Sequence, residues 1–213
     1  MLNPGSFSTI GNFWAMEKLG QVRLSQHFYL RQFLYSEIAA AFDLPNNPIN
    51  IDLAIENGKQ LCTSILEPIV EHWGPIVVRS GYRSPVVNAV GAARGLKCAS
   101  NSKNAGAHIW DMPDKYGDVG ACACIVVPKL VDEASSSEHW RVMAEWLATN
   151  VPFHRATFFQ RDFALNVGWN TNPVGEVKSL IPPRVTYKVE TGAGFGAVRK
   201  CPIFEPLNEE LNK

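Results

Sequence analysis

Two short segments of the sequence carry side chains that could take part in chemistry. One is the Gly81-Tyr82-Arg83-Ser84-Pro85 turn, where Arg83 carries a guanidinium, a group that can hold a carboxylate in a two-pronged hydrogen bond. The other is His108-Ile109-Trp110-Asp111, whose imidazole and carboxylate are groups that zinc binds. Residues 91–107 join them and are rich in Gly, Ala, Ser, Asn and Lys, and a loop of this length is usually functional or disordered. In a simpler interpretation, Arg83 only ties down its own turn.

The elements that precede these segments read mainly as helices. Ser25 is a candidate N-cap for a helix whose apolar residues recur up to the break at residues 45–48. A second, longer helix is predicted from about Asn50 to Trp73, and Gly74 ends it. A short β-branched strand over 75–79 then leads into the arginine-containing turn, and a short helix follows over 86–90.

The elements that follow are mostly strands. The apolar run at 121–127 predicts a buried strand, on which Cys122 and Cys124 occupy alternate positions and share one face. A helix is predicted over 139–150 and further strands over 156–159 and 163–167. Helices come first and strands later, which predicts an α+β domain with N-terminal helices packed on a small antiparallel or mixed sheet.

The chain is expected to form one domain with an extension at each end. It has 213 residues, of which 46% are hydrophobic, and this is enough to bury one sizeable core. We expect an N-terminal arm at 1–23, the domain at 24–181 and a weakly patterned tail at 182–213.

Composition excludes several classes of protein. The 20 basic residues balance 20 acidic ones, so charge gives no support for nucleic-acid binding. Five cysteines without Cys-x-x-Cys spacing argue against a disulfide framework and against a zinc ribbon. We see neither a leader with basic and apolar regions nor an apolar stretch of membrane length. We therefore expect no signal peptide, no membrane span and synthesis in the cytoplasm.

The stretch from Leu66 to Pro85 resembles the zinc D-alanyl-D-alanine carboxypeptidases of the Hedgehog/D,D-peptidase fold. The upstream Leu24-Ser25-x-His27-Phe28 and the break at 45–48 match the lead-in helices common in that family. The resemblance covers roughly residues 24–130 and extends more loosely to 170. It implies hydrolysis of a peptide bond between D-amino acids, with zinc polarising the carbonyl and activating a water molecule.

The resemblance also implies three protein ligands for the zinc. In the family, two come from a Ser-x-His-x(6)-Asp stretch and the third from a later Trp-x-His segment. The gap-free match here is Ser102-Lys103-Asn104-x(6)-Asp111, so an asparagine stands where the first histidine is expected. An amide oxygen is a poor zinc donor beside imidazole, and His108 could fill the vacancy if the loop is rearranged.

The metal candidates are therefore His108 and Asp111, with a third ligand still open. Asn170 stands where the later histidine is expected, and His154 and His139 are alternatives that a linear sequence does not rank. Each of these histidines could instead be an ordinary surface or capping residue. The resemblance further places Arg83 near the scissile bond as a catalytic and substrate-binding residue. Ser102 and Trp110 are further candidates for substrate contact, although tryptophan is more often a packing residue.

Two functions follow from this pattern. The first is a zinc-dependent peptidase that cleaves peptidoglycan stem peptides or cross-links. The second is a catalytically inactive relative that serves as a structural or cell-wall-binding protein, for example a component of a bacteriophage virion that contacts other virion proteins through its arm and tail. Either would be virion-associated or released to the cell wall. The phage setting comes from the habits of the family and not from any spacing in the chain.

Overall fold

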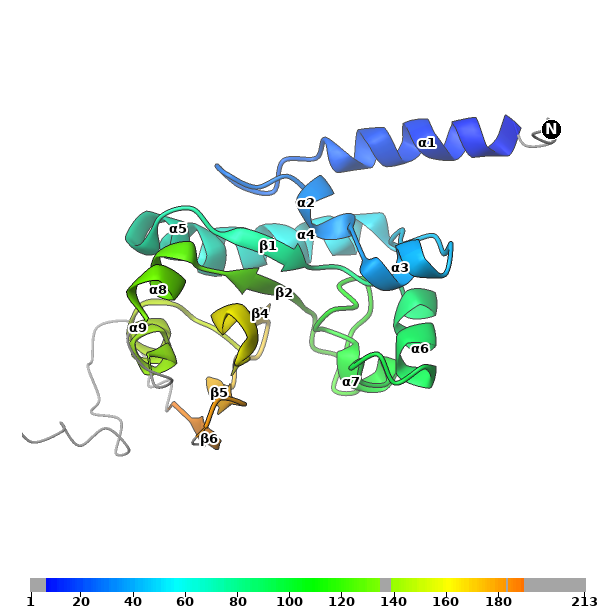
Figure 1. Cartoon of the computed structure of the whole chain (residues 1–213). Coiled ribbons are helices and arrows are strands. Elements are labelled where there is room, and N and C mark those ends of the chain that lie inside the picture. The colour runs from blue at the N-terminus through cyan, green and yellow to red at the C-terminus, as the bar shows by residue number, and fades with distance from the viewer. Residues whose placement is uncertain (1–6, 135–138, 183, 190–213) are drawn as a thin grey trace, which may run out of the picture.

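The computed structural model describes residues 7–134, 139–182 and 184–189, and its helices and six-stranded mixed sheet confirm the α+β class (Figure 1). The helices are α1 (Phe7–Gly20), α2 (Arg31–Leu34), α3 (Glu37–Ala41), α4 (Ile51–Leu61), α5 (Glu67–Trp73), α6 (Pro85–Ala93), α7 (Asn101–Asn104), α8 (Pro128–Glu133) and α9 (Trp140–Asn150). A π-helical turn (Cys62–Leu66) and a 3₁₀ turn (Arg161–Phe163) complete the helical elements. The strands are β1 (Val77–Ser80), β2 (Gly120–Val126), β3 (Arg155–Phe158), β4 (Leu165–Asn170), β5 (Glu176–Ser179) and β6 (Val185–Lys188).

The strands lie in the order β1-β2-β4-β3-β5-β6, and all neighbours are antiparallel except β3 and β5. One face of this sheet is apolar. Ala121, Ala123 and Ile125 of β2 are completely buried there, and α4 packs against β2 and β4. The main core therefore lies between the sheet and the α4–α5 segment.

The opposite face of the sheet is polar at its centre. Directly paired residues of neighbouring strands share a face, and the register pairs Cys122 with Gly168 and Cys124 with Asn166. Thr157 of β3 pairs with Asn166, so it lies on the same face, in line with Asn166 and Cys124. The predicted placement of both cysteines on one face is thus confirmed, and their neighbours on that face are small or polar.

The second predicted helix has the expected ends. Asn50 caps α4 by accepting a hydrogen bond from the Leu53 amide at 3.2 Å, and Gly74 ends α5 with a φ of 85°. Between α4 and α5 the chain takes one π-helical turn, Cys62–Leu66. This turn keeps the two helices continuous along the apolar face of the sheet.

The first predicted helix is divided, and its predicted N-cap is wrong. Two short helices, α2 and α3, replace it, and Ser36 caps α3 by accepting from the Ala39 amide at 3.3 Å. Ser25 instead donates its hydroxyl hydrogen to Glu67 Oε1 at 2.5 Å. A partner 42 residues later in the chain thus replaces the local backbone as the partner of Ser25.

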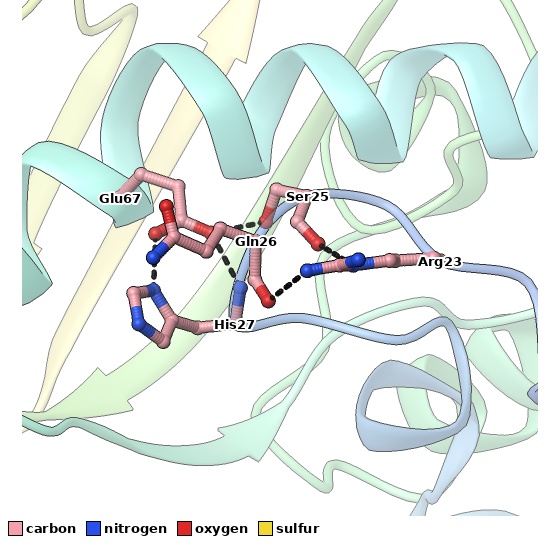
Figure 2. A network of polar contacts seen from close by, with 5 residues as sticks. All are labelled: Arg23, Ser25, Gln26, His27 and Glu67. Atoms are coloured by element: carbon pink, nitrogen blue, oxygen red, sulfur yellow. Dashed lines mark hydrogen bonds and ion pairs between the residues drawn. The ribbon is translucent and has the colours of Figure 1, made fainter.

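Figure 2 shows how Glu67 fixes the lead-in segment. Its carboxylate also accepts from the His27 amide at 2.8 Å and contacts His27 Nδ1 at 2.6 Å, while Arg23 donates to the Ser25 and Gln26 carbonyls. Burial alone would raise the pKa of Glu67, but the hydrogen bonds from Ser25 and His27 lower it overall. Ser25 and His27 bind the carboxylate rather than one another, so they do not form a nucleophile–base pair.

The predicted arm and tail contain regular structure where they are described. In the arm, α1 lies along one side of the molecule, away from the sheet (Figure 1). In the tail, β6 pairs with β5 and extends the sheet beyond residue 181. Residues 1–6 and 190–213 lie outside the described ranges. Across the described part of the chain, no helix has both the length and the apolar character needed to cross a membrane.

Candidate functional site

A cavity of about 170 Å³ lies between the loop that follows α7 and the polar face of the sheet, and we call it the loop–sheet cavity. The loop reaches the sheet through a close approach of two glycines. A Cβ added at Gly120 would lie only 2.5 Å from the Gly106 carbonyl oxygen, so glycine is needed there. The lining residues are Lys103, Asn104, Gly106, Ala107, His108, Ala121, Cys122, His154, Arg155, Thr157, Asn166, Gly168 and Trp169.

The His108 ring is buried in this cavity and held in one orientation by a hydrogen bond. It is 5% exposed, and its Nδ1 lies 2.8 Å from the Gly81 carbonyl oxygen. A carbonyl only accepts, so Nδ1 carries the hydrogen and Nε2 presents a lone pair that can accept from the Asn166 amide. Burial lowers the pKa of His108 to about 4, and the positive charge of Arg83 adds to this effect. The ring is therefore neutral at neutral pH.

Nε2 of His108 faces two side chains of the sheet. Cys122 Sγ lies 3.9 Å away and Asn166 Nδ2 lies 3.4 Å away. Burial raises the pKa of the Cys122 thiol to about 12, with a further contribution from Cys124. The pair is thus a neutral thiol beside a neutral imidazole. The sequence singled out neither Cys122 nor Asn166 as a site residue, and its one signal was the alternation that puts Cys122 and Cys124 on one face of a strand.

Asn104, which stands at the expected first zinc histidine, has a structural role. Its amide donates to Asn88 Oδ1 at 2.7 Å, and Asn88 donates to the Ala99 carbonyl at 3.0 Å and to Asn101 Oδ1 at 2.8 Å. Asn88 is completely buried and Asn104 is 8% exposed. These amides hold α7 and the segment before it against α6, in a stretch that the sequence predicts to be loop throughout.

Asp111 also binds protein groups, and it does not line the loop–sheet cavity. Its Oδ2 accepts from the Ile49 amide at 2.7 Å, and the Asn50 amide lies 3.4 Å away. Oδ1 is buried without a hydrogen-bond partner among the described residues. Burial, with the negative charge of Asp111, raises the pKa of Tyr82. The predicted pair His108 and Asp111 is therefore not brought together around the cavity.

The three candidates for a third ligand lie in different places. Asn170 is 3% exposed at the end of β4, and its Oδ1 accepts from the Asn172 amide at 2.8 Å. His139 directly precedes α9, which Figure 1 places across the molecule from α7. Only His154 lines the same cavity as His108, with its Nδ1 3.2 Å from the Asn172 carbonyl oxygen. Burial, and then the charge of Arg155, lower the pKa of His154.

The expected substrate contacts are also dispersed. Arg83 donates through Nη1 to Cys98 Sγ at 3.3 Å, and its backbone amide donates to the His108 carbonyl at 2.8 Å. Ser102 is exposed, and its hydroxyl lies 3.1 Å from that of Ser100. Trp110 has no exposed surface and donates its indole hydrogen to the Cys122 carbonyl at 3.1 Å. Trp110 thus packs in the core and supports β2.

The family's zinc ligand set does not fit these residues. Asn104 and Asp111 bind backbone and amide groups, and Asn170 closes a turn. Within the described ranges, no three His, Cys, Asp or Glu side chains are grouped so that they could hold a metal ion. The side chains at the family's ligand positions are therefore engaged in holding the fold.

No protein-family model matches the sequence, and neither the curated proteins nor the solved structures include a match. The likeness to the D,D-peptidases therefore rests on the motifs of the sequence.

Proposed function

We propose that this chain is a relative of the D,D-peptidases, with their Hedgehog/D,D-peptidase fold, that binds peptidoglycan stem peptides without the family's catalytic zinc. The loop–sheet cavity would take the free carboxylate at the end of such a peptide. We propose the setting that the family resemblance suggests, which is a virion or the cell wall. The arm and tail would then be available to neighbouring proteins.

The charge of the cavity lining carries this proposal. Lys103 and Arg155 contribute two cations, and the described lining includes no Asp or Glu. Arg155 makes a loose ion pair, since its Nε lies 3.6 Å from Glu176 Oε1, and its side chain is 57% exposed. A ligand that ends in a carboxylate would find complementary charge and hydrogen-bond donors here.

The structural use of the family's ligand positions supports binding over hydrolysis. Asn104 holds the loop and Asp111 holds the Ile49 amide just before α4, so recruiting them to a metal would break these hydrogen bonds. One observation favours the peptidase alternative. The His108 Nε2 lone pair faces the cavity, where an imidazole could act as a base or as a metal ligand.

Calorimetry with two synthetic stem peptides would test the proposal. One peptide ends in two D-alanines with a free carboxylate, and the other is the same peptide with an amide end. We expect the free carboxylate to bind more tightly, and the Lys103→Gln/Arg155→Gln double variant to lose that preference. Lys129→Gln on α8 is the matched charge control, outside the cavity lining. Equal binding of both peptides, or no binding, would overturn the proposal.

The same peptides separate binding from hydrolysis. The free-carboxylate peptide is incubated with the chain, with and without added zinc, and released D-alanine is measured. We expect none above the level with a His108→Gln variant. Release that requires both zinc and His108 would replace the binding proposal with the peptidase alternative.

A further inference from the structure

The side chains of His108 and Cys122 are arranged like a pair of metal ligands. A metal-binding histidine usually donates its other ring hydrogen to a carbonyl or carboxylate, which fixes the tautomer and the direction of the lone pair. The Gly81 carbonyl does this for His108, and the freed Nε2 points at Cys122 Sγ across 3.9 Å. Both residues line the loop–sheet cavity, so an ion has a route to them.

We propose that Cys122 and His108 bind a single thiophilic divalent cation of the zinc class, at a site distinct from the Asn104–Asp111 pattern that the family resemblance implies. Zinc lies about 2.3 Å from a thiolate sulfur and about 2.0–2.1 Å from an imidazole nitrogen. At these lengths the 3.9 Å separation corresponds to an S–Zn–N angle of roughly 125–130°, moderately wider than tetrahedral. The two ligands can thus reach one ion with little movement.

Asn166 and solvent complete the coordination. The Asn166 amide lies 3.4 Å from His108 Nε2, and a rotation of its amide group by half a turn brings Oδ1 toward the ion. Because an amide oxygen is a weak donor for zinc, the third and fourth positions remain exchangeable. Gly168 pairs with Cys122 and adds no side chain that would cover the ion from the sheet.

The binding step releases one proton. The Cys122 thiol loses its hydrogen to solvent as the sulfur–metal bond forms, while the neutral imidazole binds through its existing lone pair. Because the metal displaces this proton, affinity increases with pH. Metal binding is measured without any peptide, so its result does not depend on the proposed peptide binding.

Titration of the reduced, chelator-stripped full chain with Co²⁺ and then Zn²⁺ would test this site. We expect a thiolate-to-cobalt charge-transfer band that saturates at one ion per chain and disappears when zinc is added. Cys122→Ser should abolish the band, and His108→Gln should weaken zinc binding by more than about ten-fold, a scale seen even for residues that only support a ligand. Cys124→Ser, on the same strand and face, is the matched control and should leave both unchanged. A band that survives Cys122→Ser, or no band at all, would overturn the proposal.

Alkylation of the unaltered chain provides a second measurement that needs no variant. Iodoacetamide labelling at each cysteine is followed by mass spectrometry with and without zinc. We expect zinc to slow labelling of Cys122 and to leave Cys98 unaffected, because Cys98 lies with Arg83 outside the cavity lining. Equal labelling of Cys122 with and without zinc would contradict the site.

Discussion

The Asp111 carboxylate accepts a hydrogen bond from the Ile49 backbone amide at 2.7 Å and thereby joins segments that are 62 residues apart. The Asn50 amide, at the start of α4, lies 3.4 Å from the same oxygen. This carboxylate therefore ties the start of α4 to the loop that bears His108. Its main contribution should be to stability.

Asp111→Ala should lower the free energy of unfolding by about 1–3 kcal/mol, because the Ile49 amide loses its charged acceptor at 2.7 Å. Urea unfolding with a chelator present would measure this. The exposed Asp52→Ala, in the first turn of α4, is the control and should change stability by less than about 1 kcal/mol. If Asp111→Ala mattered only when zinc was added, Asp111 would be a metal ligand and not a structural residue.

Asn104→His should not restore a family-type zinc site. The histidine would remove the amide that donates to Asn88 Oδ1 at 2.7 Å and leave a completely buried acceptor unpaired. We expect a loss of about 1–3 kcal/mol in the free energy of unfolding and no gain in zinc binding over the parent chain. Ser102→Ala, on the exposed side of the same short helix, controls for changes in α7. Tighter zinc binding by Asn104→His would show that position 104 can still reach a metal.

Much of the fold could be predicted from local patterns, and the site could not. Asn50 and Gly74 mark helix ends because capping and termination depend on a few neighbouring residues. The orientation of the His108 ring depends on the Gly81 carbonyl, 27 residues earlier, and on Asn166, 58 residues later. Partners this far apart in the chain produce no recognisable pattern in the sequence. For the same reason, Ser25 resembled a helix cap when its partner was Glu67.

Glu67→Gln should change how stability depends on pH. Glu67 has a lowered pKa in the folded chain, so its contribution is complete above the ordinary glutamate value of about 4.3 and is lost as the pH falls through the folded-state value. At neutral pH we expect Glu67→Gln to cost about 1 kcal/mol, because hydrogen bonds from Ser25 and His27 lose a charged acceptor. The difference from the parent chain should shrink on acidification.

Thermal unfolding followed by circular dichroism from neutral pH to below pH 4 would measure that difference. Glu71→Gln, an exposed carboxylate one turn later in α5, is the matched control and should track the parent chain. If the two variants were equally stable at every pH, the network of Figure 2 would contribute nothing to the fold.

Gly120→Ala should loosen the contact between the loop and the sheet. Its Cβ would meet the Gly106 and Trp169 carbonyl oxygens, each at 2.5 Å, and neither backbone group is free to rotate away. Overpacking of this kind costs about 1–3 kcal/mol, and displacement of the loop should also expose the Cys122 thiol. Urea unfolding and the rate of reaction with a thiol reagent would measure the two effects.

Gly117→Ala separates crowding from backbone strain, because its φ is 87° and no atom lies within 4 Å of the added Cβ. It should cost about 1–2 kcal/mol from strain and leave thiol reactivity unchanged, since the loop keeps its place against the sheet. Gly120→Ala, in contrast, should lose stability and gain thiol reactivity together. Unchanged thiol reactivity in Gly120→Ala would show that the cavity does not depend on this approach of the two glycines.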